Sequence, residues 1–321
     1  MVSKFLNAAA GATAALVLCF GFAPEAQAQG LTYNSGQSIS PAFEGWRNAD
    51  DGGYLLMFGY MNRNWEEQPD LPVGSDNFFA PGPQDRGQPT HFLPRRNRFI
   101  FEVHVPADFG DQELTWTLRA HGVEQVAYGS LRPDYFVDNV VIMSENGALG
   151  AGTSNPELRA HTPPVVEMET AAEIEAVVGR PVSLVALVSD DGLPRRSRGQ
   201  LPIDDEGNLD LTRALRAPPS RVTPQKIMGL NISWFVYRGP EGSQDAVSYN
   251  PPQPAVWEDT RPFSNSPWAP FWVPPELPED GRWVTEVTFS EPGTYLLMGR
   301  ADDGGLYTDR QVLVTVRPPA L

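Results

Sequence analysis

Apolar and polar residues alternate in many short runs of this chain, and this alternation constrains the fold more than any other feature. Turn-forming residues separate the runs, since 32 prolines and 29 glycines are spread along the chain. Side chains of a β-strand point to opposite faces in turn, so a two-residue period is typical of a half-buried strand. Long amphipathic helical patterns are absent from the sequence. We therefore expect an all-β fold.

Two segments of the first half indicate which faces are buried. A strand is predicted at 98–106, whose apolar face is made of Phe99, Phe101, Val103 and Val105, with Ile100 as the exception to the alternation. A hairpin is predicted over 113–131, with a turn at His121 and Gly122. Leu114, Trp116 and Leu118 alternate in its first strand, and we expect them to point into a core.

Two further segments, 53–61 and 135–143, are almost continuously apolar. Strands that are covered on both sides carry such unbroken apolar runs. We therefore predict that both segments are fully buried strands.

Two domains of ordinary size fit the length of the chain. The segment 146–164 is rich in Gly, Ser, Asn and Pro and has no apolar period, which is typical of a linker. We predict two tandem immunoglobulin-like β-sandwich domains after a signal peptide, the first at 29–145 and the second at 165–321. Long insertions are expected in the second domain at 193–229 and 250–282.

The N-terminus has the organisation of a secretory signal peptide. A positive residue, Lys4, precedes an apolar run over 8–23, and Ala26 and Ala28 form an A-x-A cleavage site. The run is shorter than the roughly 20 residues that a membrane span needs. We predict that residues 1–28 are removed by cleavage after Ala28, and that the mature chain is exported to the periplasm or the extracellular space.

Cysteine content and charge exclude several classes of function. Cys19 is the only cysteine and lies inside the predicted signal peptide, so the mature chain is expected to lack disulfides and thiol chemistry. A lipoprotein would use Cys19, but Leu18 stands where a small residue is expected. The net charge of −16 argues against nucleic acid and against a purely electrostatic hold on anionic lipid. No segment after the signal peptide is apolar enough to span a membrane.

The order of motifs in the second half resembles that of a PKD-like (polycystic-kidney-disease-type) immunoglobulin-like domain, over about 165–318. The matching elements are "VSLVALVSDDG" at 182–192, Trp234, "FSEPGTY" at 289–295, "LLMGRADDGG" at 296–305 and "VLVTV" at 312–316. The resemblance implies an all-β sandwich that works as a binding or spacing module. The insertions at 193–229 and 250–282 depart from the family pattern.

Two residues of the second half support a Greek-key sandwich on physical grounds. Pro292-Gly293 makes a sharp corner, and Tyr295 begins the next strand at the position of a tyrosine corner. Trp234 is large enough to fill the space between two sheets. We expect both side chains to be buried.

Two Asp-Asp-Gly loops form the first candidate site. In an immunoglobulin-like topology they meet at one end of the sandwich, and we expect them to bring together Asp190, Asp191, Asp302, Asp303 and Asp309. Calcium takes six to eight oxygen ligands, so the cluster is a candidate calcium site. The alternative is that these residues only form turns, or are neutralised by Arg195, Arg196 and Arg198.

An aromatic segment forms the second candidate site. The segment 250–282 carries Trp257, Phe263, Trp268, Phe271 and Trp272 among prolines. Rigid aromatic side chains bind sugar rings or anchor a protein partner. The alternative is that the segment folds back and buries these rings.

The irregular segment 58–99 forms the third candidate site. Its polar residues include Asn62, Arg63, Asn64, Trp65, Glu66, Glu67, Asp85, Arg86, His91, Arg95 and Arg96. A hydrolase would use two of the carboxylates as acid and base, but the spacing does not select a pair. The alternative is a loop held by ion pairs. The standard motifs of zinc proteases, serine hydrolases and nucleotide-binding loops are absent.

Three functions remain open after these observations. The first is a non-catalytic exported protein that binds a protein or glycan or acts as a spacer, with no cofactor unless the acidic loops bind calcium. The second is an extracytoplasmic hydrolase with its site in 58–99. The third is a subunit of an extracellular assembly that is joined through strand edges or aromatic residues.

Overall fold

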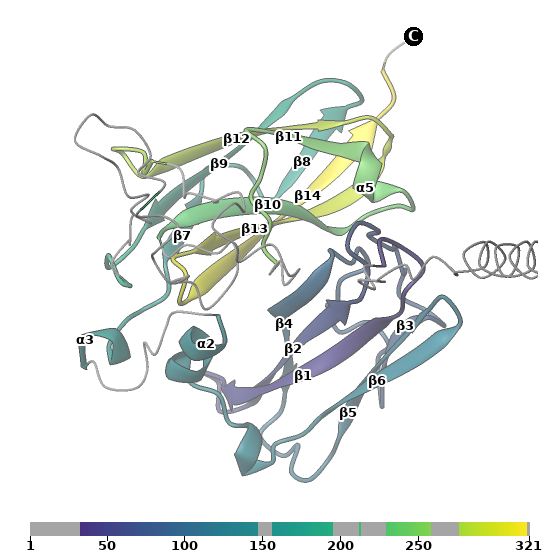
Figure 1. Ribbon diagram of the computed structural model, residues 1–321, viewed down its shortest axis with the longest axis vertical. Coiled ribbons are helices and arrows are strands. Elements are labelled where there is room, and N and C mark those ends of the chain that lie inside the picture. The colour runs from purple at the N-terminus through teal and green to yellow at the C-terminus, as the bar shows by residue number, and fades with distance from the viewer. Residues whose placement is uncertain (1–32, 147–155, 195–211, 213–228, 258–275, 320–321) are drawn as a thin grey trace, which may run out of the picture. The chain divides into compact units, whose positions relative to one another are not determined.

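The computed structural model describes residues 33–146, 156–194, 229–257 and 276–319, together with Thr212. The predicted signal peptide lies outside these residues. Residues Asn34–Leu321 belong to one compact unit. Within the described residues the regular secondary structure is mostly β-strand, arranged as two β-sandwiches (Figure 1), which confirms the all-β prediction.

The first sandwich contains two three-stranded antiparallel sheets. One has the order β1-β2-β4 and the other the order β3-β5-β6. The strands are β1 (Ile39–Asn48), β2 (Tyr54–Asn62), β3 (Asn77–Ala80), β4 (Arg95–Val105), β5 (Leu114–Ala120) and β6 (Val123–Gly129). The predicted hairpin is present as β5 and β6, and its two turn residues, His121 and Gly122, both have positive φ, as a two-residue hairpin turn requires.

Aromatic rings fill the space between these two sheets. Trp116 is fully buried and lies parallel to Phe79 with 5.8 Å between ring centroids, while Phe101 meets Trp116 edge-on at 5.0 Å. Leu114 and Leu118 are buried beside them, which confirms the predicted inner face of this hairpin. Such aromatic pairs each contribute about 0.5–1.5 kcal/mol beyond their buried area.

The prediction for β4 was wrong at Phe99. Phe101, Val103 and Val105 do point into the core, but Phe99 belongs to a second apolar cluster with Met57, Ile142 and Leu306, and Ile100 takes the inner position. The cause is a break in register: the pairing of β4 with β2 shifts after Phe58, and Phe99 has a φ of 50°. An irregularity of this kind reverses the alternation on one side of it.

The prediction of a strand at 135–143 was also wrong. The segment begins at the last residue of the short helix η1 (Pro133–Tyr135) and runs into the helix α2 (Asn139–Glu145). The Asp138 side chain accepts a hydrogen bond from the amide of Val141 at 2.9 Å, which is the geometry of a helix N-cap. The other apolar segment is β2, and it is buried as predicted.

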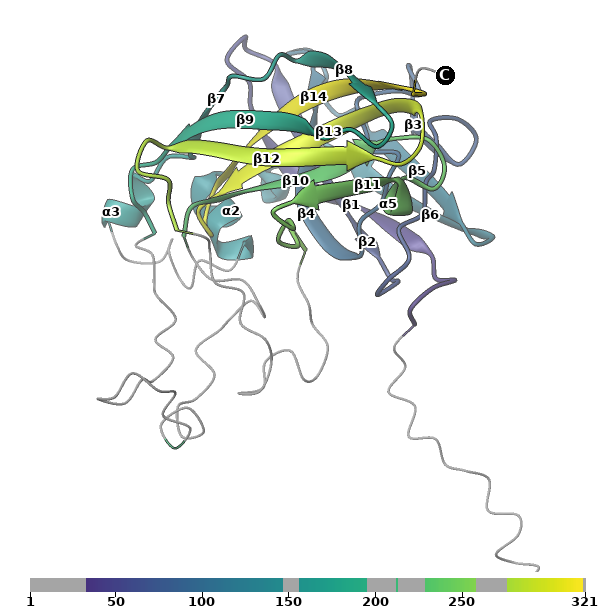
Figure 2. The same cartoon turned by 90° about the horizontal axis from the view of Figure 1, so that it is seen from above.

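The second sandwich has four strands in each sheet (Figure 2). The sheet orders are β11-β12-β9-β7 and β10-β13-β14-β8. The strands are β7 (Val165–Met168), β8 (Glu173–Val177), β9 (Val182–Ser189), β10 (Asn231–Arg238), β11 (Val247–Asn250), β12 (Arg282–Phe289), β13 (Gly293–Asp302) and β14 (Tyr307–Arg317). Two short helices also occur: α3 (Pro156–Arg159) precedes β7, and α5 (Ser243–Ala246) lies between β10 and β11.

This strand order is that of an immunoglobulin-like sandwich. β7, β9, β12 and β11 take the positions of strands A, B, E and D, and β10, β13 and β14 those of strands C, F and G. Trp234 is 2 % exposed in the core, and the hydroxyl of Tyr295 donates to the carbonyl of Glu291 at 3.2 Å. Both predicted core residues are thus confirmed, the second as a tyrosine corner.

The two sandwiches share an apolar cluster within the compact unit. Phe235, Tyr237 and Met298 of the second sandwich belong to the same buried cluster as the rings of the first. The predicted boundary at 146–164 stays a prediction, and α3 lies inside that segment. The insertion predicted at 193–229 lies almost entirely outside the described residues, as does most of 250–282.

Candidate functional site

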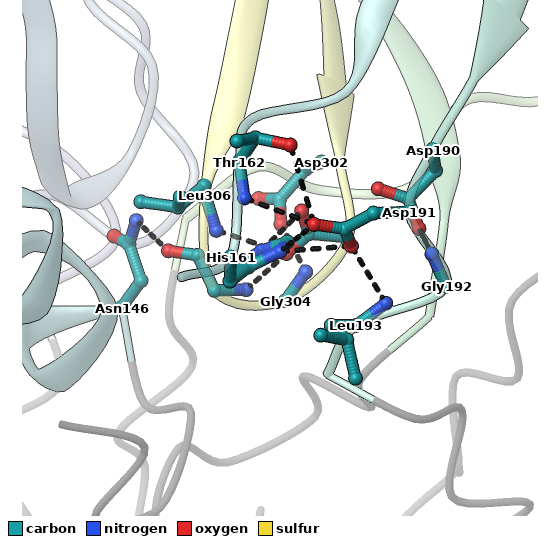
Figure 3. A network of polar contacts seen from close by, with 12 residues as sticks. Asn146, His161, Thr162, Asp190, Asp191, Gly192, Leu193, Asp302, Gly304 and Leu306 are labelled. Carbon is teal, nitrogen blue, oxygen red and sulfur yellow. Dashed lines mark hydrogen bonds and ion pairs between the residues drawn. The ribbon is translucent and has the colours of Figure 1, made fainter. Parts of the chain in front are cut away.

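One end of the second sandwich gathers acidic side chains around a histidine (Figure 3). Two turns supply the acids: the segment after β9, which contains Asp190 and Asp191, and the turn between β13 and β14, which contains Asp303. The histidine is His161, from the segment that follows α3. The structure therefore brings the two predicted Asp-Asp-Gly loops to the same end of the sandwich.

His161 lies between two carboxylates. Its Nδ1 is 2.9 Å from each carboxylate oxygen of Asp191, and its Nε2 is 3.0 Å from Oδ2 of Asp303. Both ring nitrogens can donate at once only when the ring carries two protons. Burial of the ring lowers the pKa of His161, but the hydrogen bonds and charges of Asp303 and Asp191 outweigh it and raise the pKa to about 9.

Both carboxylates also bind backbone amides. Oδ1 of Asp303 accepts from the amides of Gly305 at 2.6 Å and Leu306 at 2.9 Å, so it holds the β13–β14 turn in shape. Asp191 accepts from the amides of Thr162 at 3.0 Å and Leu193 at 2.9 Å. The Asp–His–Asp bridge, as we name Asp191, His161 and Asp303, therefore ties the segment after α3 to two loops of the sandwich.

The two acids of the bridge differ in environment. The pKa of Asp303 is raised by burial, although its hydrogen bond to His161 acts in the opposite direction. For Asp191 burial also raises the pKa, but the hydrogen bonds from Thr162, His161 and Leu193 outweigh burial, and the net pKa is lowered. Asp303 is 1 % exposed and Asp191 is 30 % exposed at the side chain, which accounts for the difference.

The other predicted acids have separate partners. Oδ2 of Asp190 accepts from the amide of Gly192, while its Oδ1 is buried without a hydrogen-bond partner among the described residues. Burial, together with the charges of Asp303 and Asp191, raises the pKa of Asp190. Asp302 accepts from the amide of Gly304 at 2.6 Å. Arg300 donates two hydrogen bonds of 2.8 Å to the carboxylate of Asp309.

The calcium hypothesis stays a prediction. Within the described ranges no group of three or more histidine, cysteine, aspartate or glutamate side chains is placed to hold a metal ion. A calcium ion at Asp191 and Asp303 would have to compete with His161 and four backbone amides for the carboxylate oxygens. Thermal unfolding in millimolar calcium and then in EDTA tests the hypothesis, and an unchanged midpoint would contradict it.

Only one of the predicted aromatic site residues can be placed. Trp257 is partly buried and packs against the apolar cluster shared by the two sandwiches. Phe263, Trp268, Phe271 and Trp272 lie outside the described residues. The binding role predicted for this group is therefore untested.

The polar residues of 58–99 do not converge on one pocket. Asp85 forms an ion pair with Arg238, and Glu67 contacts His121 at 3.0 Å. His91 bonds to Asp70 at 2.7 Å and to Gln68 at 2.9 Å. Other members contact one another only in small groups: Arg95 stacks on the ring of Trp65 at 3.9 Å, and Nδ2 of Asn64 donates to Oδ1 of Asn62 at 2.9 Å, while Glu66 is exposed.

Two features were missed at the level of sequence. His161 lies inside the segment predicted as a linker, 146–164, and stands 142 residues from Asp303, so no spacing pattern connects them. A cleft of about 530 Å³ is lined by residues of both sandwiches, among them Arg47, Glu102 and Asp309.

No helix among the described residues is long and apolar enough to cross a membrane.

Comparisons with known proteins find distant structural similarity only. No family model and no curated protein matches the chain. An immunoglobulin complex of titin with obscurin-like 1 is 13 % identical, with 50 % of this chain and 99 % of that chain covered and a TM-score of 0.22. A mutant SrpA adhesin from Streptococcus sanguinis is 15 % identical, with 49 % and 58 % covered and a TM-score of 0.23.

A further solved structure covers both sandwiches. Domains 4 and 5 of the S-layer protein SbsC are 8 % identical, with 87 % of this chain and 98 % of that chain covered, at a TM-score of 0.20. At TM-scores this low, the likeness supports no conclusion about the function of this chain.

Proposed function

We propose that this chain is an exported, non-catalytic protein that binds a protein partner, with its two sandwiches held as one rigid body. Export is supported by the signal-peptide pattern of residues 1–28. The PKD-like assignment of the second sandwich belongs to the same proposal and is supported by its motif order. Binding and spacing are the usual roles of such modules.

The contacts of the 58–99 segment with the second sandwich, which we call the joint, are the observation that carries the proposal. Asp85 forms two hydrogen bonds to Arg238, at 2.7 and 3.0 Å, and the amides of Thr90 and His91 donate to the carbonyl of Tyr237. The long loop of the first sandwich therefore holds the second sandwich. Asp85, one of the carboxylates that a hydrolase would use, is engaged in this connection.

A buried histidine completes the joint. His91 is 2 % exposed at its side chain and bonds to Asp70, whose other oxygen accepts from the amides of Gly242 at 2.9 Å and Ser243 at 3.2 Å. Polar groups that are buried and satisfied in this way fix one arrangement of the parts they join. A fixed arrangement presents any binding surface with a smaller loss of conformational entropy on association.

Affinity capture from the source organism tests the proposal. Mature protein, from residue 29 onward, would be immobilised and exposed to the organism's exported proteins, with quantitative mass spectrometry as the readout. We expect one or a few proteins to be retained and to bind the purified chain in a direct titration. A glycan array and a panel of glycoside, ester and peptide substrates are run in parallel. Glycan binding without protein binding, or turnover of any substrate, would overturn the proposal.

A further inference from the structure

The cleft between β4 and β14 has the size of a ligand site. Its volume of about 530 Å³ falls in the range of ligand pockets, which are roughly 300–1,000 Å³ and occur preferentially between domains. Phe101, Met298 and Leu306 give it an apolar lining, and Arg47, Glu102 and Gln311 are among its polar residues. Neither the joint nor the Asp–His–Asp bridge uses these polar side chains.

One strand at the cleft has a free backbone edge. β14 pairs with β8 only from Leu313 onward, and the amide of Leu313 points away from β13 because it donates to the carbonyl of Ala172 at 2.8 Å. The pairing of β14 with β13 runs without a register shift. Amides two residues apart in a strand point to the same edge. The amides of Tyr307, Asp309 and Gln311 therefore point to that edge too, ahead of β8.

These three amides have no backbone partner among the described residues. On the same edge, the carbonyl of Asp309 accepts from Nη1 of Arg310. On the other side of the cleft, β4 is the last strand of its sheet, and Arg300 donates to the carbonyls of Arg98 and Phe99. An unpaired strand edge beside a cleft is where an extended peptide adds a strand.

The side chains at the cleft suggest what such a peptide carries. Arg47 and Glu102 form an ion pair at 2.5 Å, and Arg300 and Asp309 form another at 2.8 Å. The Arg47 side chain as a whole is 38 % exposed and lines the cleft, and a guanidinium favours carboxylate and amide oxygens, so a ligand oxygen is favoured there.

We propose that this cleft binds an extended peptide segment of the partner, which pairs with the free edge of β14 at Tyr307–Gln311 and places a side-chain oxygen, from Asp, Glu, Asn or Gln, on the guanidinium of Arg47. The inference rests on the proposed function, since it names the part of a protein partner that this chain holds. Main-chain hydrogen bonds supply affinity in such strand addition, and side-chain pockets supply specificity.

Selection from a phage-displayed library of random twelve-residue peptides tests the inference. The exposed Gln311 is changed to Trp, which fills the cleft from its rim, and the exposed Thr315, on the same face of β14 but outside the cleft, is changed to Trp as the matched control. We expect selected peptides to bind Q311W at least about tenfold more weakly than wild type and to bind T315W within about twofold. Both variants should keep the wild-type unfolding midpoint.

Two further readouts separate strand addition from other modes of binding. Hydrogen exchange at the amides of Tyr307, Asp309 and Gln311 should slow on peptide binding, because those amides gain acceptors. Arg47→Met should weaken only peptides that carry the acceptor side chain. Peptides that bind Q311W as well as wild type, or leave these amides unprotected, would overturn the cleft inference and leave the proposed function standing. If no peptide is selected, the inference is also overturned, and capture of a folded partner decides the proposed function separately.

Discussion

At the scale of single residues, the fully buried ring of His161 pairs with two carboxylates of the second sandwich, Asp191 and Asp303. Removing it would leave Asp303, which is 1 % exposed, as a buried charge without a cation. For His161→Gln we expect a loss of about 2–3 kcal/mol in the free energy of unfolding, below the full 3–5 kcal/mol for a broken buried pair, because Asp191 is 30 % exposed. Urea unfolding at neutral pH measures this loss.

A second histidine of this chain serves as the control for that variant. His104 pairs with Asp51 at 2.9 Å, but both side chains are about half exposed or more, at 49 % and 63 %. Exposed pairs contribute little. His104→Gln should therefore leave the unfolding midpoint unchanged within error. Equal losses of stability in the two variants would show that the buried His161 pair stabilises the fold no more than the exposed His104 pair.

The charge of His161 also gives a pH dependence with a definite sign. Its pKa rises from the ordinary value of 6.5 to about 9 in the folded chain, with Asp303 and Asp191 as the groups that outweigh burial. Because the folded-state pKa is the higher one, the stabilisation is fully present below pH 6.5 and is lost as pH rises through about 9. The stability difference between wild type and His161→Gln should therefore shrink from pH 7 to pH 10. A ring-proton NMR titration with a midpoint near 6.5 would contradict the bridge.

At the scale of elements, the tyrosine corner links β12 to β13. The hydroxyl of Tyr295 bonds to the carbonyl of Glu291, so Tyr295→Phe deletes one hydrogen bond and leaves that carbonyl without this donor. We expect a loss of about 1 kcal/mol in the free energy of unfolding. Tyr128→Phe makes the same chemical change at a side chain that is 58 % exposed and should change nothing. If Tyr295→Phe leaves the free energy of unfolding unchanged, the corner is held by ring packing alone.

The elements also show which features of the fold can be predicted from the sequence. The fold class, Trp234 and the tyrosine corner were predictable because each depends on local pattern: a two-residue period, a bulky ring in a strand, or a proline-glycine corner. The segment 135–143 was mistaken for a strand because an apolar run is ambiguous without its cap, and Asp138 supplies that cap. Phe99 was misplaced because alternation holds only while the register is kept.

The candidate site was predictable only in part. Topology alone was enough to expect Asp191 and Asp303 at one end of the sandwich. His161 between them depends on where the segment after α3 returns, and no local pattern encodes that path. The free edge of β14 likewise depends on where β8 begins to pair, at Leu313, and that start is a tertiary event.

At the scale of the whole molecule, the two sandwiches should unfold as one cooperative unit. The shared cluster includes Tyr237, which is 1 % exposed and whose hydroxyl donates to the carbonyl of Gly87 at 2.5 Å. Calorimetry of the wild type should show a single transition with equal calorimetric and van't Hoff enthalpies. Two transitions in the wild type would argue against a rigid body and therefore against the proposed function.

Truncation of the joint should separate the two sandwiches. Tyr237→Ala removes the ring from the shared cluster along with its bond to Gly87, a change that costs about 3–5 kcal/mol for a large buried ring. The loss falls on the contact between the sandwiches, so we expect the single transition to split into two. Phe289→Ala is the matched control, because Phe289 is fully buried but belongs to the core of the second sandwich alone. It should destabilise by a similar amount, mainly in the second sandwich. If Tyr237→Ala lowers the midpoint without splitting the transition, the joint contributes stability but does not set the cooperativity of the two sandwiches.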